Sequence, residues 1–133
     1  MHDSRPWVAR VTRHPLLPPQ RAELEALFGS NVRILQFDIT HNQNLDKAII
    51  NFDSMLSSRH YIAVEVVASS RILGALLRSR TIQSGTILIR PVMSRLPEHL
   101  VMRDEYYSFE GYERIIDIRE ITEHLMPPYV PSG

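Results

Sequence analysis

The strongest constraint on the fold is an alternation of short β-rich runs with helical segments over the first two thirds of the chain. Trp7 to Thr12 and Asn31 to Ile39 are β-rich runs, the first of them alternating. Tyr61 to Ala68 is apolar except for Glu65, as in a strand covered on both faces. Thr86 to Met93 is a fourth run. Strands separated by helices in this way predict a mainly parallel sheet.

Helices are predicted between these runs. Pro18 and Pro19 precede Gln20 to Phe28, where apolar residues recur at helical spacing, and a polar break leads into a second helical pattern over Leu45 to Ser57. Arg71 to Arg80 forms a third, with a serine pair before it as a helix cap. Right-handed crossovers then imply a small Rossmann-like α/β sheet with helices on both faces.

The C-terminal third departs from this rhythm. Leu100 to Met102, Tyr106 to Phe109 and Glu113 to Ile118 resemble one or two further strands, or a hairpin that turns around Glu110-Gly111. We therefore expect a C-terminal β extension with an antiparallel edge.

Length and composition predict one domain. The chain has 133 residues, of which 44% are hydrophobic, enough to bury a core. We expect a single domain over residues 1–126 and a tail, Pro127 to Gly133, that is extended or disordered because it holds three prolines. Without cysteine, disulfides and thiolate chemistry are excluded. No apolar run is long enough to span a bilayer, and we expect a soluble cytoplasmic protein with no membrane partner.

Charge and motifs remove several function classes. Fifteen basic and fifteen acidic residues cancel, which argues against binding to long duplex nucleic acid. The chain has five glycines and no glycine-rich nucleotide loop, so it lacks the usual nicotinamide and ATP motifs. The six histidines do not fall at metal-ligand spacing. We expect neither a metal nor a cofactor.

Polar side chains gather where the predicted strands end. Because the carboxyl ends of parallel strands share one edge, we expect these groups, with helix-start amides at Pro19 and Ser70, to bind an anion such as phosphate. The alternative is that they cap helices and contact water, which is the ordinary role of Thr40, Ser69 and Ser70. The candidates are Arg13, His14, Thr40, His41, Asn42, Ser69, Ser70, Arg71, Arg90 and Arg95.

An aromatic group follows in the C-terminal extension. Tyr106, Tyr107, Phe109 and Tyr112 are suited either to stack on bases or to pack against a partner subunit. We favour a dimer interface.

The stretch His14-Pro15-Leu16-Leu17-Pro18-Pro19-Gln20 resembles the H-x-L-T-x-x-Q opening of small CRISPR-associated proteins grouped with the ring nucleases, with Leu17 in place of the threonine. Those proteins are similar to stand-alone CARF domains. The resemblance implies a homodimer that binds cyclic oligoadenylate in antiviral signalling and opens the ring, without metal, by attack of a ribose 2′-hydroxyl.

In this reading Arg13 and Arg71 stabilise developing negative charge and His14 exchanges a proton. The alternatives are a homodimeric sensor or regulator that binds nucleotide without cleaving it, and a purely structural interaction protein.

Overall fold

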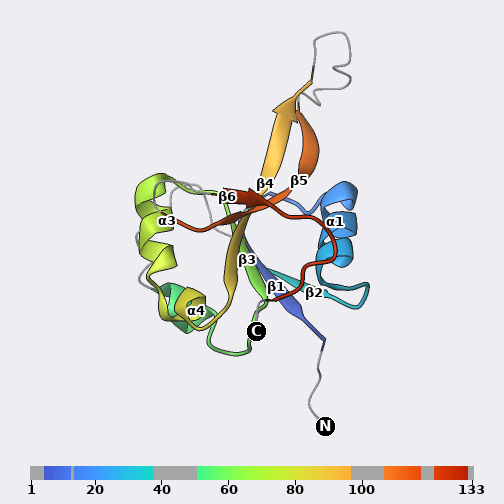
Figure 1. Ribbon diagram of the computed structural model, residues 1–133. Coiled ribbons are helices and arrows are strands. Elements are labelled where there is room, and N and C mark those ends of the chain that lie inside the picture. The colour runs from blue at the N-terminus through green and yellow to red at the C-terminus, as the bar shows by residue number, and fades with distance from the viewer. Residues whose placement is uncertain (1–4, 13, 38–50, 97–106, 118–121, 132–133) are drawn as a thin grey trace.

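The described part of the chain forms a six-stranded sheet with helices on both faces, and the predicted α/β fold class is confirmed (Figure 1). The computed structural model describes residues 5–12, 14–37, 51–96, 107–117 and 122–131. The elements in chain order are β1 (Trp7–Val11), α1 (Pro18–Phe28), β2 (Arg33–Phe37), β3 (Ala63–Val66), α3 (Ser70–Leu77), α4 (Arg80–Gln83), β4 (Ile87–Arg95), β5 (Tyr107–Ile115) and β6 (Thr122–His124). Of the predicted second helix, residues 51–57 are described; residues 51–55 are helical and the last two form a turn.

The strand order is β2-β1-β3-β4-β5-β6. The first four of these strands are parallel, whereas β5 runs antiparallel to both β4 and β6. The expected mostly parallel sheet with an antiparallel C-terminal extension is therefore confirmed.

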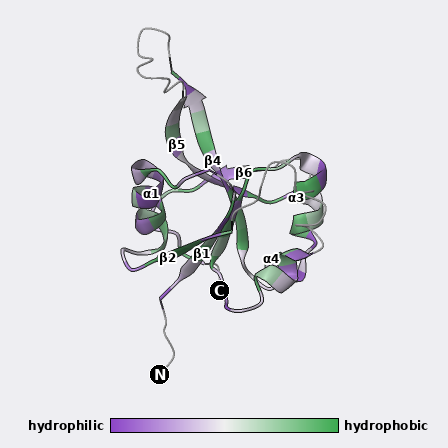
Figure 2. Ribbon diagram, turned by 180° about the vertical axis from the view of Figure 1, so that it is seen from behind, coloured by the Kyte–Doolittle hydropathy of each residue, from purple (hydrophilic) through white to green (hydrophobic). Residues whose placement is uncertain are grey.

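Two apolar layers hold the sheet between its helices. On one face, Leu24, Leu27 and Phe28 of α1 pack on Val8 and Ala63. On the other face, α3 packs through Ile72, Leu73 and Leu76 on Ala9, Val64 and Leu88. The alternation along each strand sends neighbouring side chains into opposite layers, which explains the nearly continuous apolar character of β3. Figure 2 shows hydrophilic and hydrophobic residues alternating along the turns of α1 and α3.

The predicted turn at Glu110-Gly111 is wrong, because β5 continues through both residues. The pairing with β4 shifts there, with Val92 opposite Gly111 and Met93 opposite Phe109, so that Glu110 is an extra residue. Gly111 has a φ of 124°, which side chains disfavour. The glycine signal marks a β-bulge in place of a turn.

Beyond the parallel sheet, β4 and β5 continue as a projecting two-stranded ribbon (Figure 1). Only Ile87 to Ile89 of β4 pair with β3, whereas the pairing with β5 extends to Arg95. The predicted strand at Leu100 to Met102 lies outside the described residues.

The C-terminal tail packs on α1. The amide of Tyr129 donates to the carbonyl of Leu27 (2.8 Å), and its ring meets that of Phe28 edge to face at 5.7 Å. The described tail residues contain no helix or strand. Tyr129 thus fixes the tail near the amino end of the sheet.

Candidate functional site

A cavity of about 560 Å³ lies at the carboxyl edge of the sheet, between the start of α1, the ends of β1 and β3 and the middle of β4. Its polar lining residues are Arg10, Thr12, His14, Gln20 and Glu65. Its apolar lining residues are Pro15, Leu17, Val67, Pro91 and Met93. Leu17, Val67 and Met93 are 43%, 60% and 41% exposed, so the mouth of the cavity is apolar.

A buried ion pair forms the floor of this cavity. Arg10 and Glu65 are register partners on β1 and β3 and are almost fully buried. Arg10 Nε donates to Glu65 Oε1 (3.0 Å) and Arg10 Nη2 donates to Glu65 Oε2 (3.2 Å). The two parallel bonds are the fork geometry in which arginine pairs most strongly with carboxylate. The floor is therefore electrically neutral.

Tyr112 of β5 supports this floor from within the core, without lining the cavity itself. Its hydroxyl donates to Glu65 Oε1 at 2.7 Å, and the residue is fully buried. Burial, reinforced by the Glu65 carboxylate, raises the pKa of the Tyr112 hydroxyl far above its usual range. Tyr112 is thus a permanent hydrogen-bond donor at physiological pH.

The same buried network holds the backbone of His14. The carbonyl of His14 accepts from Arg10 Nη1 (3.1 Å) and from Gln36 Nε2 (3.0 Å). The amide of His14 donates to Thr12 Oγ1 at 3.2 Å. Gln36 is itself tied in place, because its Oε1 accepts from Arg10 Nη1 (2.8 Å). His14 is therefore anchored by its main chain while its side chain is exposed at the cavity.

The start of α1 does not offer the set of free backbone amides that was expected to bind an anion there. The helix begins at Pro18, and neither Pro18 nor Pro19 has a backbone N–H to offer an anion. The side chain of Gln20 is buried and its Oε1 accepts from the Leu17 amide (3.0 Å). Among the first three residues of α1, only Gln20 has a backbone N–H. The binding of an anion at this edge would therefore depend on side chains.

The predicted site residues fall into three groups. His14 lines the cavity. Arg13, Thr40, His41 and Asn42 lie outside the described residues.

The third group lies away from the cavity. Ser69 caps α3, its hydroxyl accepting from the Ile72 amide at 3.5 Å, and Ser70 and Arg71 are exposed on the first turn of that helix. Arg90 points to the opposite face of β4 from Pro91 and forms an ion pair with Glu113. Arg95 is exposed at the far end of β4, on the ribbon.

The aromatic group is divided by the structure. Tyr112 belongs to the core and contacts Phe109 edge to face, with ring centroids 5.1 Å apart. The expectation that Tyr112 is exposed for a partner is therefore wrong. Tyr106 and the side chain of Tyr107 lie outside what the structure describes.

Sequence reasoning missed the Arg10–Glu65 pair at the floor of the cavity and the two side chains that bond to it, Gln36 and Tyr112. A signal was present, because Glu65 interrupts a run of apolar residues and a buried carboxylate requires a cation or several donors. Arg10 occupies an inward position of the first alternating run. Pairing two such exceptions from neighbouring strands would have located the network.

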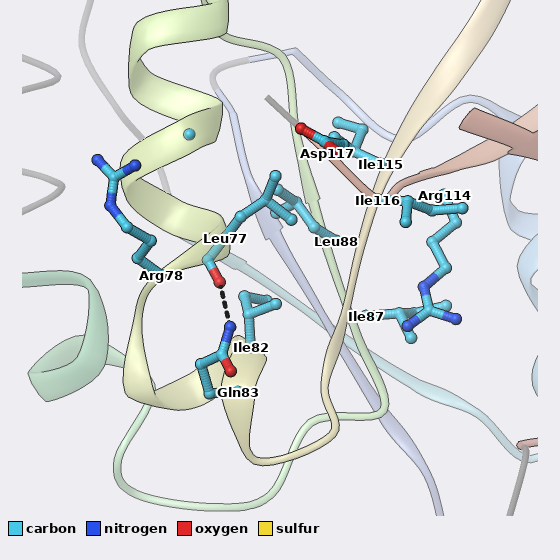
Figure 3. Close-up of a pocket in the computed structure, with 11 residues that line it drawn as sticks. Leu77, Arg78, Ile82, Gln83, Ile87, Leu88, Arg114, Ile115, Ile116 and Asp117 are labelled. Carbon is cyan, nitrogen blue, oxygen red and sulfur yellow. Dashed lines mark hydrogen bonds between the residues drawn. The ribbon is translucent and has the colours of Figure 1, made fainter. Parts of the chain in front are cut away.

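A smaller cavity of about 360 Å³ lies on the α3 side of the sheet (Figure 3). Leu77, Ile82 and Leu88 contribute apolar walls, and Gln83 Nε2 donates to the Leu77 carbonyl at 2.8 Å. No predicted site residue is among the described residues that line it.

Among the residues that the structure describes, no cluster of three or more histidine or acidic side chains is placed to hold a metal ion. Within the same part of the chain, no helix has the length and apolar character needed to cross a bilayer. No protein-family model, curated protein or solved structure matches this chain.

Proposed function

We propose that this protein binds a cyclic oligoadenylate messenger at the cavity of the carboxyl edge. One observation supports the proposal most: His14, Pro15, Leu17 and Gln20, four residues of the stretch that resembles the ring-nuclease opening, all line this cavity. The resemblance is a property of the sequence alone, and the cavity is an independent property of the fold.

The residues that line the cavity are suited to an adenine base whose phosphate lies outside the cavity. A base buries flat, largely apolar faces, which match the walls made by Leu17, Pro91 and Met93. The neutral Arg10–Glu65 floor offers polar edges without net charge. The phosphate would then lie at the rim, beside the side chain of His14.

Ring opening, if the bound messenger is cleaved, needs three events at one phosphate. The ribose 2′-oxygen attacks the adjacent phosphorus and loses its proton, the bond from phosphorus to the 5′-oxygen breaks, and that oxygen gains a proton. The products are a 2′,3′-cyclic phosphate and a 5′-hydroxyl. His14 is suited to one of the proton transfers because its backbone is fixed by three hydrogen bonds while its side chain is exposed. Arg13 is the proposed cation, whereas Arg71, the other cation of the sequence hypothesis, lies away from this cavity on the first turn of α3.

A homodimer is part of this proposal, since a cyclic ligand with repeated nucleotides presents equivalent bases to two equivalent cavities. The non-catalytic alternative, a homodimeric sensor, is favoured by the neutral floor: the carboxylate of Glu65 is already engaged by Arg10 and Tyr112.

The experiment is incubation of the purified protein with cyclic tri-, tetra- and hexa-adenylate in EDTA, with binding and linear products followed by chromatography and mass. We expect binding, and products ending in a 2′,3′-cyclic phosphate that His14→Ala abolishes. His124→Ala, which removes another exposed histidine, is the matched control. Intact bound ligand would select the sensor, and absence of binding to any ring would refute the proposal.

A second variant tests the cavity itself. Val67→Asp places a carboxylate at the exposed mouth and should weaken binding by about tenfold or more through charge repulsion, whereas Val67→Thr should change it little. Equal affinity of the two variants would place the ligand elsewhere.

A further inference from the structure

The amino ends of the parallel strands, opposite the cavity described above, carry arginines around Trp7. Arg33 is the register partner of Trp7, and its guanidinium lies 5.4 Å from the indole centroid. The guanidinium of Arg59, which precedes β3, lies 4.0 Å from the same ring. Cations held on an aromatic face in this way are fixed in direction and still carry their charge to solvent.

A cavity of about 500 Å³ lies beside this cluster. Arg5, Arg59 and His60 line it together with two aromatic residues, Trp7 and Tyr129. Among the described residues that line it there is no acid. The combination of cations with aromatic walls is suited to a base that carries phosphate.

A second cavity of about 670 Å³ adjoins the first, and Arg59 and His60 line both. Its other lining residues include Arg80 and the hydroxyl residues Ser54, Ser57 and Thr86. Arg59 and His60 therefore lie between two hollows of similar size.

The second cavity contains one acid among its described lining residues, and that acid is already engaged. Asp53 accepts from the amides of Arg80 (3.1 Å) and Thr81 (2.8 Å) and from Thr81 Oγ1 (2.6 Å). These hydrogen bonds lower the pKa of Asp53, and the bond from the Thr81 hydroxyl has the largest effect. Its charge is partly offset by these donors, which reduces its repulsion of a phosphate at Arg59.

From this arrangement we propose that the amino end of the sheet is a second binding site, for single-stranded nucleic acid. One phosphate contacts Arg59 and His60, one base occupies the hollow between Trp7 and Tyr129, and the neighbouring base occupies the hollow beside Arg80. Two hollows on either side of Arg59 and His60 match the order base, phosphate, base of a strand. The balanced overall charge is compatible with this site because the cations are local.

The test uses the whole protein and an eight-residue oligouridylate. Trp7 is the single tryptophan of the chain, so its fluorescence reports on this site directly. We expect saturable quenching, and affinity that falls with salt by a log–log slope of about −0.7 for each phosphate contacted. Absence of quenching, or quenching that does not saturate, would overturn the proposal.

Variants are compared by anisotropy of the labelled oligomer, because Arg59 itself affects Trp7. The double variant Arg59→Gln with His60→Gln should bind at least about tenfold more weakly. The matched control, Arg21→Gln with His124→Gln, removes the same side-chain types from exposed positions elsewhere and should bind as the parent does. Equal affinities of the two double variants would contradict the proposal.

Uridine monophosphate distinguishes a strand from a free nucleotide. The strand model predicts that the monophosphate binds far more weakly than the oligomer, because it supplies one base without the next. Equal binding would show a mononucleotide site and refute the strand. The outcome is independent of the carboxyl-edge proposal, which is tested with cyclic ligands and His14→Ala.

Discussion

Arg10 and Glu65 lie directly opposite each other on neighbouring parallel strands and join through two hydrogen bonds of 3.0 and 3.2 Å. Both are almost completely buried. Each charge is therefore stabilised by the opposite charge of its partner, because water does not reach either side chain.

Removal of one partner should be costly. Glu65→Gln leaves the Arg10 cation buried without a counter-charge, and we expect the free energy of unfolding in urea to fall by about 3–5 kcal/mol. Replacing the set by apolar residues, Arg10→Met with Glu65→Leu and Tyr112→Phe, should recover most of this loss. A single variant as stable as the parent would show that the pair is hydrated in solution.

Tyr112 and Tyr61 should respond oppositely to loss of their hydroxyls. Tyr112→Phe removes a bond to a carboxylate and should cost about 1.5–3 kcal/mol. Tyr61 is also buried, but in the described part of the chain its hydroxyl has no hydrogen-bond partner. Tyr61→Phe should therefore be neutral or stabilising in the same urea experiment, and a loss as large as that of Tyr112→Phe would contradict this assignment.

The pH dependence at alkaline pH follows from Tyr112. Its pKa is raised in the folded state above the ordinary value of 10.0, so the folded protein holds this proton more tightly than the unfolded chain does. The associated stability is complete below pH 10 and is lost as pH rises above it. Unfolding measured from pH 8 to 11 should show a decline that is smaller in Tyr112→Phe. Parallel curves for the two proteins would exclude Tyr112 as the cause.

Gly85 and Gly111 have similar φ values but different surroundings. Alanine substitutions at these two positions therefore separate the cost of backbone strain from the cost of steric clashes with neighbouring side chains. Gly85 has a φ of 115° and nothing within 4 Å of an added Cβ, whereas at Gly111 that atom would lie 3.0 Å from His124 Cε1 and 3.2 Å from Glu23 Oε2. Gly85→Ala should cost about 1–3 kcal/mol from backbone conformation alone. Gly111→Ala should cost more, and thermal unfolding of both variants checks the order.

Asp53 connects the helical residues 51–55 to the start of α4 through three hydrogen bonds. Asp53→Ala should destabilise the protein by about 1 kcal/mol, as for loss of a helix cap, with faster amide exchange at Arg80 and Thr81. Because the folded pKa of Asp53 is lowered, its contribution is present above pH 3.8 and is lost as pH falls through the folded value. Asn51→Ala, at an exposed position of the same helical segment, is the control and should change neither quantity.

The alternation of strands and helices could be predicted because each element carries its own local signal. The run around Val64 is apolar on both faces, and α1 has prolines at its start and Gly29 at its end. These signals depend on neighbours in sequence, and they were sufficient for the class of fold.

The candidate site could be predicted only where it depends on one segment. His14 was found because it follows β1 directly. The Arg10–Glu65 pair was missed because it depends on register between strands that are 55 residues apart. The bulge was misread as a turn because Glu110-Gly111 has the composition of both, and pairing with β4 decides between them.

The extra residue, Glu110, reverses the alternation of side chains between the two faces of β5. Side chains of a regular strand alternate with a period of two, so Phe109 and Tyr112 would face opposite sides. With the bulge between them, both rings join the same layer. The bulge thus lets the two halves of β5 on either side of it each direct the side chains that pack toward the same layer. Deletion of Glu110 would move every side chain in the outer half of β5 to the opposite face.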